Sequence, residues 1–490
     1  MADLYEVGLY GLAVMGQNFA LNMASHGFRV AVCNRSPDKV DATVARAVNE
    51  GNLPLAGFKD VASFVASLER PRKVIILVVA GKPVDDTIAQ LAAYMEPGDI
   101  IVDGGNEWFP NSLRRAQELE PKGIHFVGMG ISGGEEGART GPSLMPGGPK
   151  EAFDALEPIL VKCAAQVDDG ACTAYLGPVG SGNYVKMVHN GIEYGDMQLI
   201  AEAYDILKIA GGLTNLELAQ VFEDWNKGEL ESFLIEITAK IFAKKDDLGN
   251  GDDFIVDKIL DQTGMKGTGR WVVQEAAERS IAAPTITASL DARYLSARKQ
   301  ERVIASKILN GPSEIPGVDK QQLIDDVRQA LYASKICSYA QGLNLIREAG
   351  VQNGWNIDLG ECARIWKGGC IIRAAFLDRI KSAYGKDPTL ISLLVDGDFA
   401  QELNARQYSW RRVVSLAVAS GIPTPSFSGS LSYFDSFRRE RLPANLTQAQ
   451  RDFFGGHTYE RTDRDGRFHC EWTDAHHNIG NVAERVLGNL

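Results

Sequence analysis

The first third of the chain alternates short apolar runs with segments of helical spacing. Runs of consecutive apolar residues predict strands at 4–9, 29–33, 74–79, 100–102 and 125–129. Between them, apolar residues recur every three to four positions, which predicts helices at 17–26, 37–50, 84–95 and 111–121. Strands that alternate with helices form a parallel sheet with helices on its faces. The pattern therefore predicts an α/β region with a doubly wound parallel sheet.

After about Gly180 the spacing becomes helical throughout. Helical stretches are predicted at 184–210, 214–242, 255–260, 271–279, 290–308 and 320–349. No strand-like run separates them. We therefore expect two large regions, an α/β region over 1–180 and an all-helical region over 181–442.

Turn-forming residues mark the end of the helical region. Gly421, Pro423, Pro425 and the serine-rich stretch 426–430 predict a break, followed by a helix that ends near Arg441. The remaining residues, 443–490, show too little apolar periodicity to form a core of their own. We expect them to form a short extended C-terminal tail that lies on its own subunit or reaches into a partner.

Composition and charge narrow the class of protein. The 490 residues suffice for about three structural units, and 45% hydrophobic with 23% charged residues is usual for a globular chain. A net charge of −12 argues against a broad nucleic-acid or anionic-membrane surface. The apolar run 74–80 is far shorter than the roughly 20 residues of a membrane span. Without a recognisable targeting segment, the expected location is cytoplasmic.

The seven cysteines are scattered and form no Cys-x-x-Cys pair, which predicts reduced, mostly buried thiols. A metal site is conceivable only in the tail, around His469, Cys470, His476 and His477. Their spacing fits no tetrahedral pattern, so no metal is expected.

A glycine-rich turn follows the first predicted strand. It consists of Gly11, Leu12, Ala13, Val14, Met15 and Gly16. Such a turn directs backbone N–H groups at a pyrophosphate at the start of the next helix, as in Rossmann-like folds. Ala13 replaces the usual middle glycine, so a merely tight turn remains an alternative. The second strand at the expected spacing favours dinucleotide binding.

The end of the second predicted strand indicates which dinucleotide. The residues there are Asn34, Arg35 and Ser36, at about the position where NAD enzymes carry an acid for the ribose 2′-hydroxyl. A carboxylate would repel a 2′-phosphate, whereas a guanidinium binds it through charge-assisted hydrogen bonds. The sequence therefore favours NADP, unless Arg35 is simply a solvated turn residue.

Four functional side chains share one predicted helix face. Lys186, His189, Asn190 and Glu193 stand at i, i+3, i+4 and i+7 and fall within an arc of roughly 100°. Such a stripe is normally apolar, so these groups need partners or a ligand. A solvated helix face is the alternative.

Three glycine-containing loops are candidate anion sites. Two follow predicted strands, at 103–106 and 132–137, where a doubly wound sheet binds ligands. Exposed N–H groups there can hold a carboxylate or phosphate, although an ordinary turn explains each loop as well. Lys266 and Thr268, separated and followed by glycines, form a third candidate for a phosphate contact.

Several motifs together resemble the decarboxylating 6-phosphogluconate dehydrogenase family from end to end of the chain. They are GLAVMG at 11–16, NRS at 34–36, DGGN at 103–106, ISGGEEGAR at 131–139, KMVHNGIEYGD at 186–196 and RDFFGGHTYE at 451–460. The resemblance implies oxidation and decarboxylation of 6-phospho-D-gluconate by NADP⁺ to ribulose 5-phosphate, in the pentose phosphate pathway and without a metal. It also implies a homodimer whose active site is shared between subunits.

The resemblance further implies roles for individual residues. Lys186 and Glu193 would be catalytic. The sugar acid would be held by Asn106, Ser132, Gly133, Gly134, His189 and Asn190. Its phosphate would be held by Tyr194, Lys266, Thr268, Arg293 and, from the other subunit, Arg451, with His457 near the sugar hydroxyls.

The cofactor would contact the 11–16 and 34–36 motifs, Asn106 and the loop of Val78, Val79 and Ala80. Many family members read Val-Lys-Ala-Gly in that loop, so Val79 removes a basic contact. This departure concerns coenzyme affinity rather than the reaction.

The residue chemistry is consistent with that reaction. As a hypothesis, neutral Lys186 takes the proton of the C3 hydroxyl, and its ammonium form then polarises the ketone so that CO₂ can leave. Protonated Glu193 delivers a proton to C1 of the enediol. The site must therefore lower the pKa of the lysine and raise the pKa of the glutamic acid.

Two other functions remain open at this stage. A non-decarboxylating β-hydroxyacid dehydrogenase would share the first region and the lysine pattern, but such enzymes are much shorter. A non-catalytic NADP-binding sensor would have no need of both Lys186 and Glu193.

Overall fold

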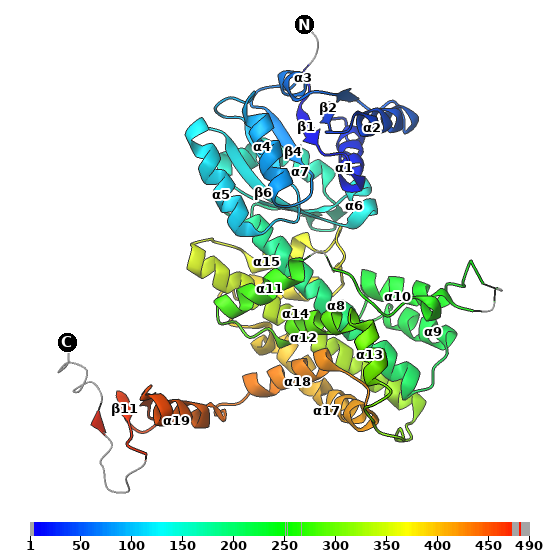
Figure 1. Cartoon of the computed structure of the whole chain (residues 1–490), viewed down its shortest axis with the longest axis vertical. Coiled ribbons are helices and arrows are strands. Elements are labelled where there is room, and N and C mark those ends of the chain that lie inside the picture. The colour runs from blue at the N-terminus through cyan, green and yellow to red at the C-terminus, as the bar shows by residue number, and fades with distance from the viewer. Residues whose placement is uncertain (1–3, 250, 252, 266, 473–479, 482–490) are drawn as a thin grey trace. The chain divides into compact units, whose positions relative to one another are not determined.

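The structure is a computed structural model that describes residues 4–249, 251, 253–265, 267–472 and 480–481 (Figure 1). The chain divides into two compact units, unit 1 up to Leu431 and unit 2 from Ser432 onward. Within unit 1 we call residues 4–180 the sheet region and residues 181–431 the helical region. The units are described separately below.

The sheet region contains one seven-stranded sheet in the order β3-β2-β1-β4-β5-β6-β7. Its strands are β1 (Val7–Tyr10), β2 (Val30–Cys33), β3 (Leu55–Phe58), β4 (Lys73–Ile76), β5 (Ile100–Asp103), β6 (His125–Ser132) and β7 (Ser143–Gly147). The first six strands are parallel, and β7 is antiparallel to β6. The order reverses between β1 and β4, where ligands of doubly wound sheets bind.

Helices cover both faces of this sheet. They are α1 (Val14–Ser25), α2 (Pro37–Asn49), α3 (Val61–Ala66), α4 (Lys82–Ala92), α5 (Phe109–Leu119), α6 (Gly134–Thr140) and α7 (Lys150–Cys163), with a 3-10 turn η1 (Glu120–Lys122). Successive strand residues point to opposite faces. Leu9 accordingly joins a core with α1 and α7, and Tyr10 joins another with α3, α4 and α5. This burial explains the continuous apolar runs of the strands.

The predicted parallel sheet is confirmed, but several elements of the sheet region had not been predicted, among them β3, β7, α3, α6 and α7. The edge strand β3 and the helix α3 are short, and β3 contains Gly57 within its Leu-Ala-Gly-Phe sequence. The strand β7 contains Pro146, which weakens a strand pattern. A two-stranded hairpin, β8 (Gln166–Val167) and β9 (Gly170–Ala171), completes the region.

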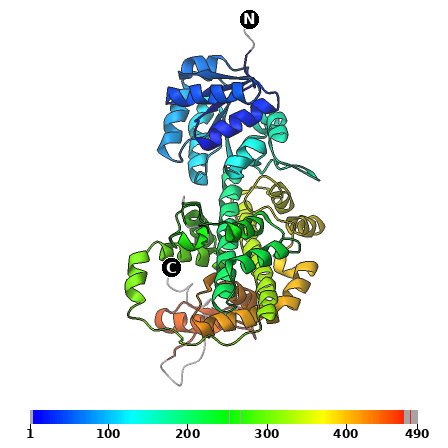
Figure 2. The same ribbon diagram turned by 90° about the vertical axis from the view of Figure 1, so that its right-hand side faces the viewer.

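The helical region is organised around two long helices, α8 and α14. Its elements are α8 (Ser181–Ile209), α9 (Asn215–Trp225), α10 (Phe233–Ala243), η2 (Ile255–Lys258), α11 (Thr268–Glu278), α12 (Pro284–Ser296), α13 (Lys299–Ala305), α14 (Lys320–Asn353), α15 (Leu359–Ile365), α16 (Leu377–Lys386), η3 (Leu393–Val395), α17 (Gly397–Ser420) and α18 (Pro425–Phe437). The helix α8 contacts β6 and β7 and then packs against α14, α11 and α12. Figure 2 shows α8 running from the sheet into the helical region.

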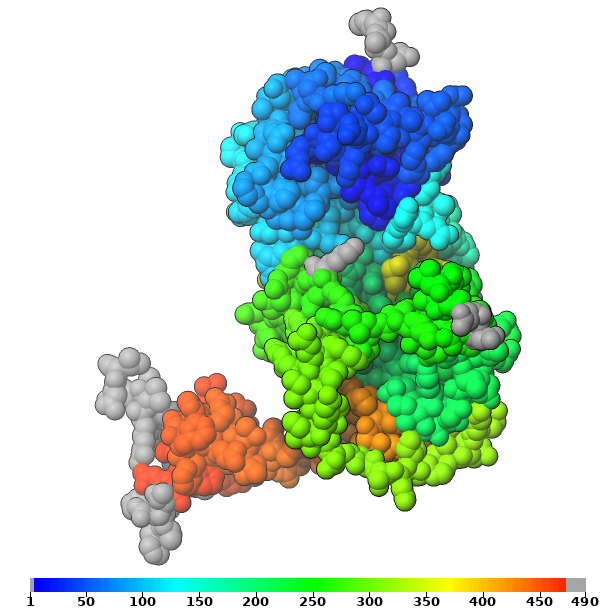
Figure 3. Space-filling view, turned by 45° about the vertical axis from the view of Figure 1, so that its right-hand side comes forward, coloured from blue at the N-terminus to red at the C-terminus, as the bar shows by residue number. Residues whose placement is uncertain are grey.

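The all-helical character of this region is confirmed, while several helix ends differ from the predictions. The predicted helices 214–242 and 290–308 are each divided in two. The break near 421 is shorter than predicted, because Gly421 closes α17 in a left-handed conformation and Pro425 already begins α18. None of the described helices is both long and apolar enough to cross a membrane. In Figure 3 the sheet region, blue to cyan, directly adjoins the green helical region.

Close packing of α8 on the sheet depends on glycines. A Cβ atom at Gly130 of β6 would lie 2.2 Å from the Cβ of Lys186, and one at Gly182 of α8 would lie 2.4 Å from the carbonyl oxygen of Gly128. Real side chains do not approach so closely, so no larger residue fits at either position. Glycine at these positions brings the start of α8 into backbone contact with β6.

Unit 2 begins within α18 and further contains α19 (Ala444–Gly455) and a three-stranded sheet of β10 (Tyr459–Glu460), β11 (Arg467–His469) and β12 (Gly480–Asn481). The tail was expected to be extended, but 444–455 is a helix. Its sequence ANLTQAQRDFFG is rich in good helix formers, although it buries Asp452 rather than an apolar stripe. The short strands agree with the predicted extended character of the rest.

The Asp452 side chain is the polar centre of unit 2. Its carboxylate accepts hydrogen bonds from the backbone N–H groups of Thr458 (2.9 Å) and Cys470 (3.0 Å), from the His469 ring (2.9 Å) and from the Trp472 indole (2.9 Å). Burial alone would raise the pKa of Asp452, but these donors hold it below its ordinary value. One buried carboxylate thus joins α19 to the strands.

Replacing Asp452 with alanine leaves these four donors without their acceptor. We expect a loss of local stability of about 3 kcal/mol, which corresponds to roughly 100-fold faster amide exchange across 452–472. Hydrogen–deuterium exchange of the full-length protein measures this effect. Asp463→Ala is the control, because Asp463 pairs only with Arg461 and Arg464 at the surface. Equal amide exchange rates in the two variants would contradict the stabilising role of Asp452 in unit 2.

Candidate active site

A cavity of about 690 Å³ lies at the carboxyl ends of β1 and β4, where the strand order reverses. Predicted cofactor residues that line it are Gly11, Leu12, Ala13, Val14, Met15, Asn34, Arg35, Ser36, Val78, Val79 and Asn106. Gly16 and Ala80 are not among the lining residues. Gly16 instead allows the tight turn, because a Cβ atom there would lie 1.8 Å from the carbonyl oxygen of Gly11.

Asn34 shapes the glycine-rich loop of this cavity. Its side-chain oxygen accepts a hydrogen bond from the Leu12 N–H group (3.0 Å), which ties the loop to the end of β2. Arg35 beside it is exposed at the cavity wall. Lys39, one turn into α2, also lines the cavity, although the sequence analysis did not single it out. Two cations therefore face the end of the cavity beside β2.

Lys186 is buried at the start of α8, with 6% of its surface exposed. Burial lowers its pKa from the ordinary value, although the nearby Glu193 carboxylate acts in the opposite direction. A lowered pKa agrees with the requirement for a neutral lysine base, and the pKa is lowered because the side chain is buried within the protein.

His189 and its neighbours form a buried polar cluster. The His189 Nε2 atom lies 3.4 Å from the Ser132 hydroxyl, and Nδ1 lies 3.1 Å from the Asn190 side-chain oxygen. Burial and the nearby Lys186 hold the pKa of His189 well below its ordinary value, so the ring is neutral. Asn190 in turn donates to the Asn106 side-chain oxygen at 3.5 Å. The cluster thus reaches from α8 to the wall of the cofactor cavity.

A second group of predicted residues gathers farther along α8. The Arg293 guanidinium stacks on the Tyr194 ring at 3.6 Å from the ring centre. A Cβ atom at Gly269 would lie 2.5 Å from the same ring, which places the start of α11 beside it. Thr268 is the buried first residue of that helix. Lys266 lies outside the described residues. A guanidinium, a phenol and a helix N-terminus are suited to a phosphate.

The loop after β6 is held by the segment that follows α15. Gly133 and Gly134 both have left-handed backbone angles, and a Cβ atom at Gly133 would lie 2.6 Å from the Gly369 carbonyl oxygen. Trp366 packs on His189 with ring centres 5.6 Å apart. The sequence patterns did not indicate this segment, because its contacts are far away along the chain.

Two predicted residues belong to unit 2. Arg451 and His457 are both exposed there. Of the tail residues considered for a metal, His469 bonds to Asp452, and His476 and His477 lie outside the described residues.

Among the described residues, one acidic cluster has metal-like spacing, and it consists of Asp168, Asp169 and Asp378. The Lys367 ammonium pairs with all three. All seven cysteines are free, and six are buried, as predicted.

The expected cytoplasmic location is wrong. Relatives from Arabidopsis thaliana and Spinacia oleracea that are 63–64% identical to this chain are named chloroplastic enzymes.

Comparison with known proteins accounts for nearly the whole chain. The model of the NAD binding domain of 6-phosphogluconate dehydrogenase matches residues 6–177, and the model of the 6-phosphogluconate dehydrogenase C-terminal domain matches residues 182–472. The chloroplastic decarboxylating enzyme 3 of Arabidopsis thaliana is 64% identical over 96% of this chain and 98% of its own length. The decarboxylating enzyme of Synechococcus elongatus is 58% identical over 96% and 99%.

A solved structure agrees with these relatives. The Plasmodium falciparum 6-phosphogluconate dehydrogenase, described in its apo form, with its cofactor NADP⁺ and with its substrate 6-phosphogluconate, is 50% identical. It superposes with a TM-score of 0.91 over 95% of this chain and 100% of its own. The dinucleotide cavity, the buried lysine of α8 and these relatives lead to one conclusion: the chain belongs to the 6-phosphogluconate dehydrogenase family.

Proposed function

We propose that this protein oxidises and decarboxylates 6-phospho-D-gluconate to ribulose 5-phosphate with NADP⁺, at a site centred on Lys186. The observation that carries the proposal is the series of contacts from His189 through Asn190 to Asn106, one turn along α8 from the buried Lys186. It joins the helix that carries a buried lysine to the wall of the dinucleotide cavity. The names of relatives that match over their full length support the decarboxylating reaction over a shorter β-hydroxyacid dehydrogenase or a non-catalytic NADP-binding sensor.

Lys186 acts first as a base in this proposal. Its lowered pKa increases the fraction of neutral amine, which accepts the proton of the C3 hydroxyl. Bound NADP⁺ supplies the hydride acceptor. The resulting Lys186 ammonium then donates a hydrogen bond to the C3 ketone oxygen, which withdraws electrons from C2. The C1–C2 bond breaks and CO₂ leaves, while the bonding electron pair forms the C2–C3 double bond and the C3 oxygen takes the proton of Lys186, which gives the enediol. When C2 is later protonated, neutral Lys186 takes this proton back and the C3 ketone forms again.

Glu193 completes the reaction by donating a proton to the former C2 carbon, which becomes C1 of ribulose 5-phosphate. It lies two turns along α8 from Lys186, and its electrostatic influence on Lys186 supports their proximity. Neutral His189 with Ser132, Asn190, Asn106 and the Gly133–Gly134 turn would hold the sugar acid. A neutral imidazole there avoids a further buried charge beside Lys186.

The substrate phosphate would bind about midway along α8. Tyr194 stands eight residues after Lys186, which is about 12 Å along the helix axis. Tyr194, Thr268 and Arg293 lie close together there, and Lys266 precedes α11 in the sequence. This separation suits a phosphate carried on C6 of an extended sugar acid.

The active site would be completed across a homodimer. Arg451 and His457 lie exposed in unit 2, which folds around its own carboxylate, whereas α8 belongs to unit 1. We assign Arg451 of the partner subunit to the phosphate and His457 of the partner subunit to the sugar hydroxyls. Residues 1–180 would then bind NADP, 181–442 would bind substrate and form the dimer, and 443–490 would reach the partner. The chloroplastic relatives support a plastid location.

Substitutions at Lys186 and Glu193 should separate the two steps of the reaction. With NADP⁺ and 6-phosphogluconate, Lys186→Met should lower NADPH formation by 10²-fold or more and show no burst, because no base remains. Glu193→Gln should form about one NADPH per site rapidly and then turn over slowly, because proton delivery follows oxidation. Stopped-flow absorbance and CO₂ release measure both.

The control for this pair is Lys208→Met, at an exposed lysine on the same helix that pairs with Asp257. It should retain wild-type kinetics. A Lys186→Met protein with near-normal NADPH production would exclude Lys186 as the base. No turnover by the wild-type protein would exclude the proposed reaction itself.

Arg35→Asp should reduce kcat/KM for NADP⁺ by two or more orders of magnitude and leave NAD⁺ nearly unaffected. The substitution replaces attraction for the 2′-phosphate by repulsion within the cavity. Steady-state kinetics with both coenzymes test this prediction. Lys122→Asp makes the same charge change at an exposed site outside the cavity lining and should alter neither value. Unchanged NADP⁺ kinetics in Arg35→Asp would remove Arg35 from the cofactor site.

Mixing two inactive variants tests the shared site. Lys186→Met and Arg451→Ala proteins, exchanged into heterodimers, should regain about a quarter of wild-type activity, because half of the dimers contain one intact site. Native mass spectrometry measures the exchange. Complete exchange without recovered turnover would place Arg451 in the site of its own subunit.

A further inference from the structure

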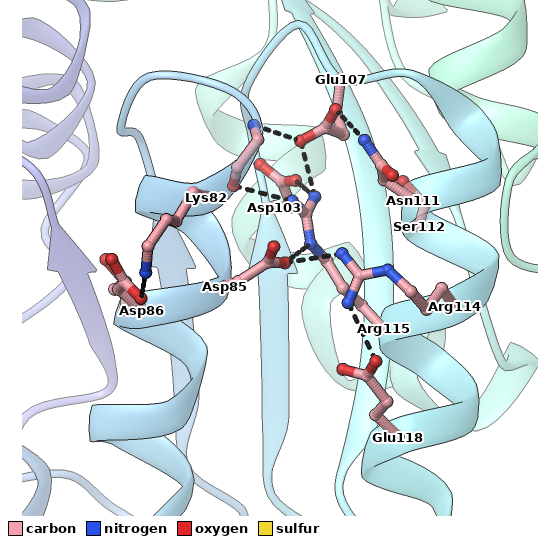
Figure 4. Close-up of polar contacts among 12 residues, drawn as sticks. Lys82, Asp85, Asp86, Asp103, Glu107, Asn111, Ser112, Arg114, Arg115 and Glu118 are labelled. Carbon is pink, nitrogen blue, oxygen red and sulfur yellow. Dashed lines mark hydrogen bonds and ion pairs between the residues drawn. The ribbon is translucent and has the colours of Figure 1, made fainter.

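Arg115 of α5 is a buried arginine with no part in the chemistry proposed above. Its side chain is 1% exposed. The guanidinium donates to the Asp85 carboxylate through Nε (2.7 Å), to Glu107 and Asp103 through Nη1 (2.7 and 3.2 Å) and to the Gly81 carbonyl oxygen through Nη2 (3.0 Å), as Figure 4 shows. One cation therefore joins three carboxylates and a backbone group.

These contacts fix two loops to each other. Gly81 ends the loop after β4, and it is held on both sides, since its N–H group also donates to Glu107 (2.9 Å). Asp103 and Glu107 flank the loop after β5, and Asp103 accepts a hydrogen bond from the Gly105 N–H group (3.0 Å). Arg115 thus connects the ends of both loops to α5.

The same two loops form a wall of the cofactor cavity. Val78 and Val79 line it from the first loop, and Gly104, Gly105 and Asn106 line it from the second. Arg115 itself is not among the lining residues. Because Asn106 also contacts Asn190, this wall adjoins the substrate side, where the nicotinamide must lie for hydride transfer.

The cost of burying these charges argues for more than a role in stability. Burial raises the pKa of Asp103 to about 6, whereas donors to Glu107 outweigh burial and hold its pKa below the ordinary value. Buried ion networks of this kind are often no more stabilising than apolar packing. Apolar side chains would not reproduce the directional hydrogen bonds that fix the two loops relative to each other.

We propose that Arg115 is a positioning residue for hydride transfer, which acts by holding the loops 78–81 and 104–107 in register around the nicotinamide end of the cofactor cavity. The inference rests on the proposed reaction. It predicts that loss of Arg115 affects the hydride-transfer step more than cofactor binding.

The test compares Arg115→Met and Arg115→Lys with the matched control Arg114→Met. Arg114 is the adjacent residue on α5, is 43% exposed and pairs with Asp85 and Glu118 without contacting either loop. Steady-state kinetics, the Kd for NADP⁺ and the isotope effect with substrate deuterated at C3 are measured for each. Melting temperatures identify variants that do not fold.

Arg115→Met should lower kcat about 10- to 100-fold and increase the deuterium isotope effect, while the Kd for NADP⁺ changes less than about threefold. Arg115→Lys should have a kcat and an isotope effect between those of Arg115→Met and wild type, because lysine retains the positive charge but lacks the planar guanidinium that donates to several acceptors at once. Arg114→Met should match wild type. A folded Arg115→Met with wild-type kcat and isotope effect would overturn the proposal.

Two other outcomes would also contradict a positioning role for Arg115. The first is an equal loss of kcat in Arg114→Met. The second applies if Arg115→Met does not fold, and it is a folded Arg115→Lys variant with wild-type kcat and isotope effect. Failure of the proposed reaction would show differently, as absence of NADPH formation by the wild-type enzyme.

Discussion

The close contact between α8 and β6 is the constraint on which the rest of the site depends. Gly128 and Gly130 leave room on the strand for the side chains of Asn183 and Lys186, and Gly182 lets the helix backbone approach the Gly128 carbonyl oxygen. This contact places Lys186 at the sheet, near the strand ends that form the dinucleotide cavity. It also starts the 29-residue helix that continues into the helical region, so Lys186 and Tyr194, from the two groups of proposed substrate residues, belong to one helix.

Burial along this helix determines the protonation of the site. Lys186 and His189 are both enclosed, and burial disfavours the charged form of each. The ammonium form of Lys186 further disfavours an imidazolium at His189. By contrast, the buried Lys335 of α14 meets the carboxylate of Asp196 on the same α8 helix. One helix therefore contributes to a structural ion pair and, ten residues earlier, presents a lysine suited to proton transfer.

The shape of the cofactor cavity depends on polar side chains that hold its loops. Asn34, at the cavity wall, holds the glycine-rich loop through the Leu12 N–H group, and Arg115, behind the wall, holds the two loops on the β4 and β5 side. Both act through backbone groups, so polar contacts fix the shape of the cavity. Substitution of such residues is expected to affect orientation more than affinity.

The sequence by itself determined the elements and motifs that are local along the chain. Apolar runs and helical spacing predicted the parallel sheet and the helical region, and the 186–193 spacing placed four functional groups on one helix face. Tertiary structure alone decided that Gly130 faces Lys186, that Gly369 supports Gly133 and that Arg115 joins two loops. These contacts join residues that are distant in sequence or depend on packing, so the spacing of apolar and polar residues along the chain could not predict them. The helix 444–455 was missed for a related reason, because its buried centre is a carboxylate, Asp452, satisfied only by the fold around it.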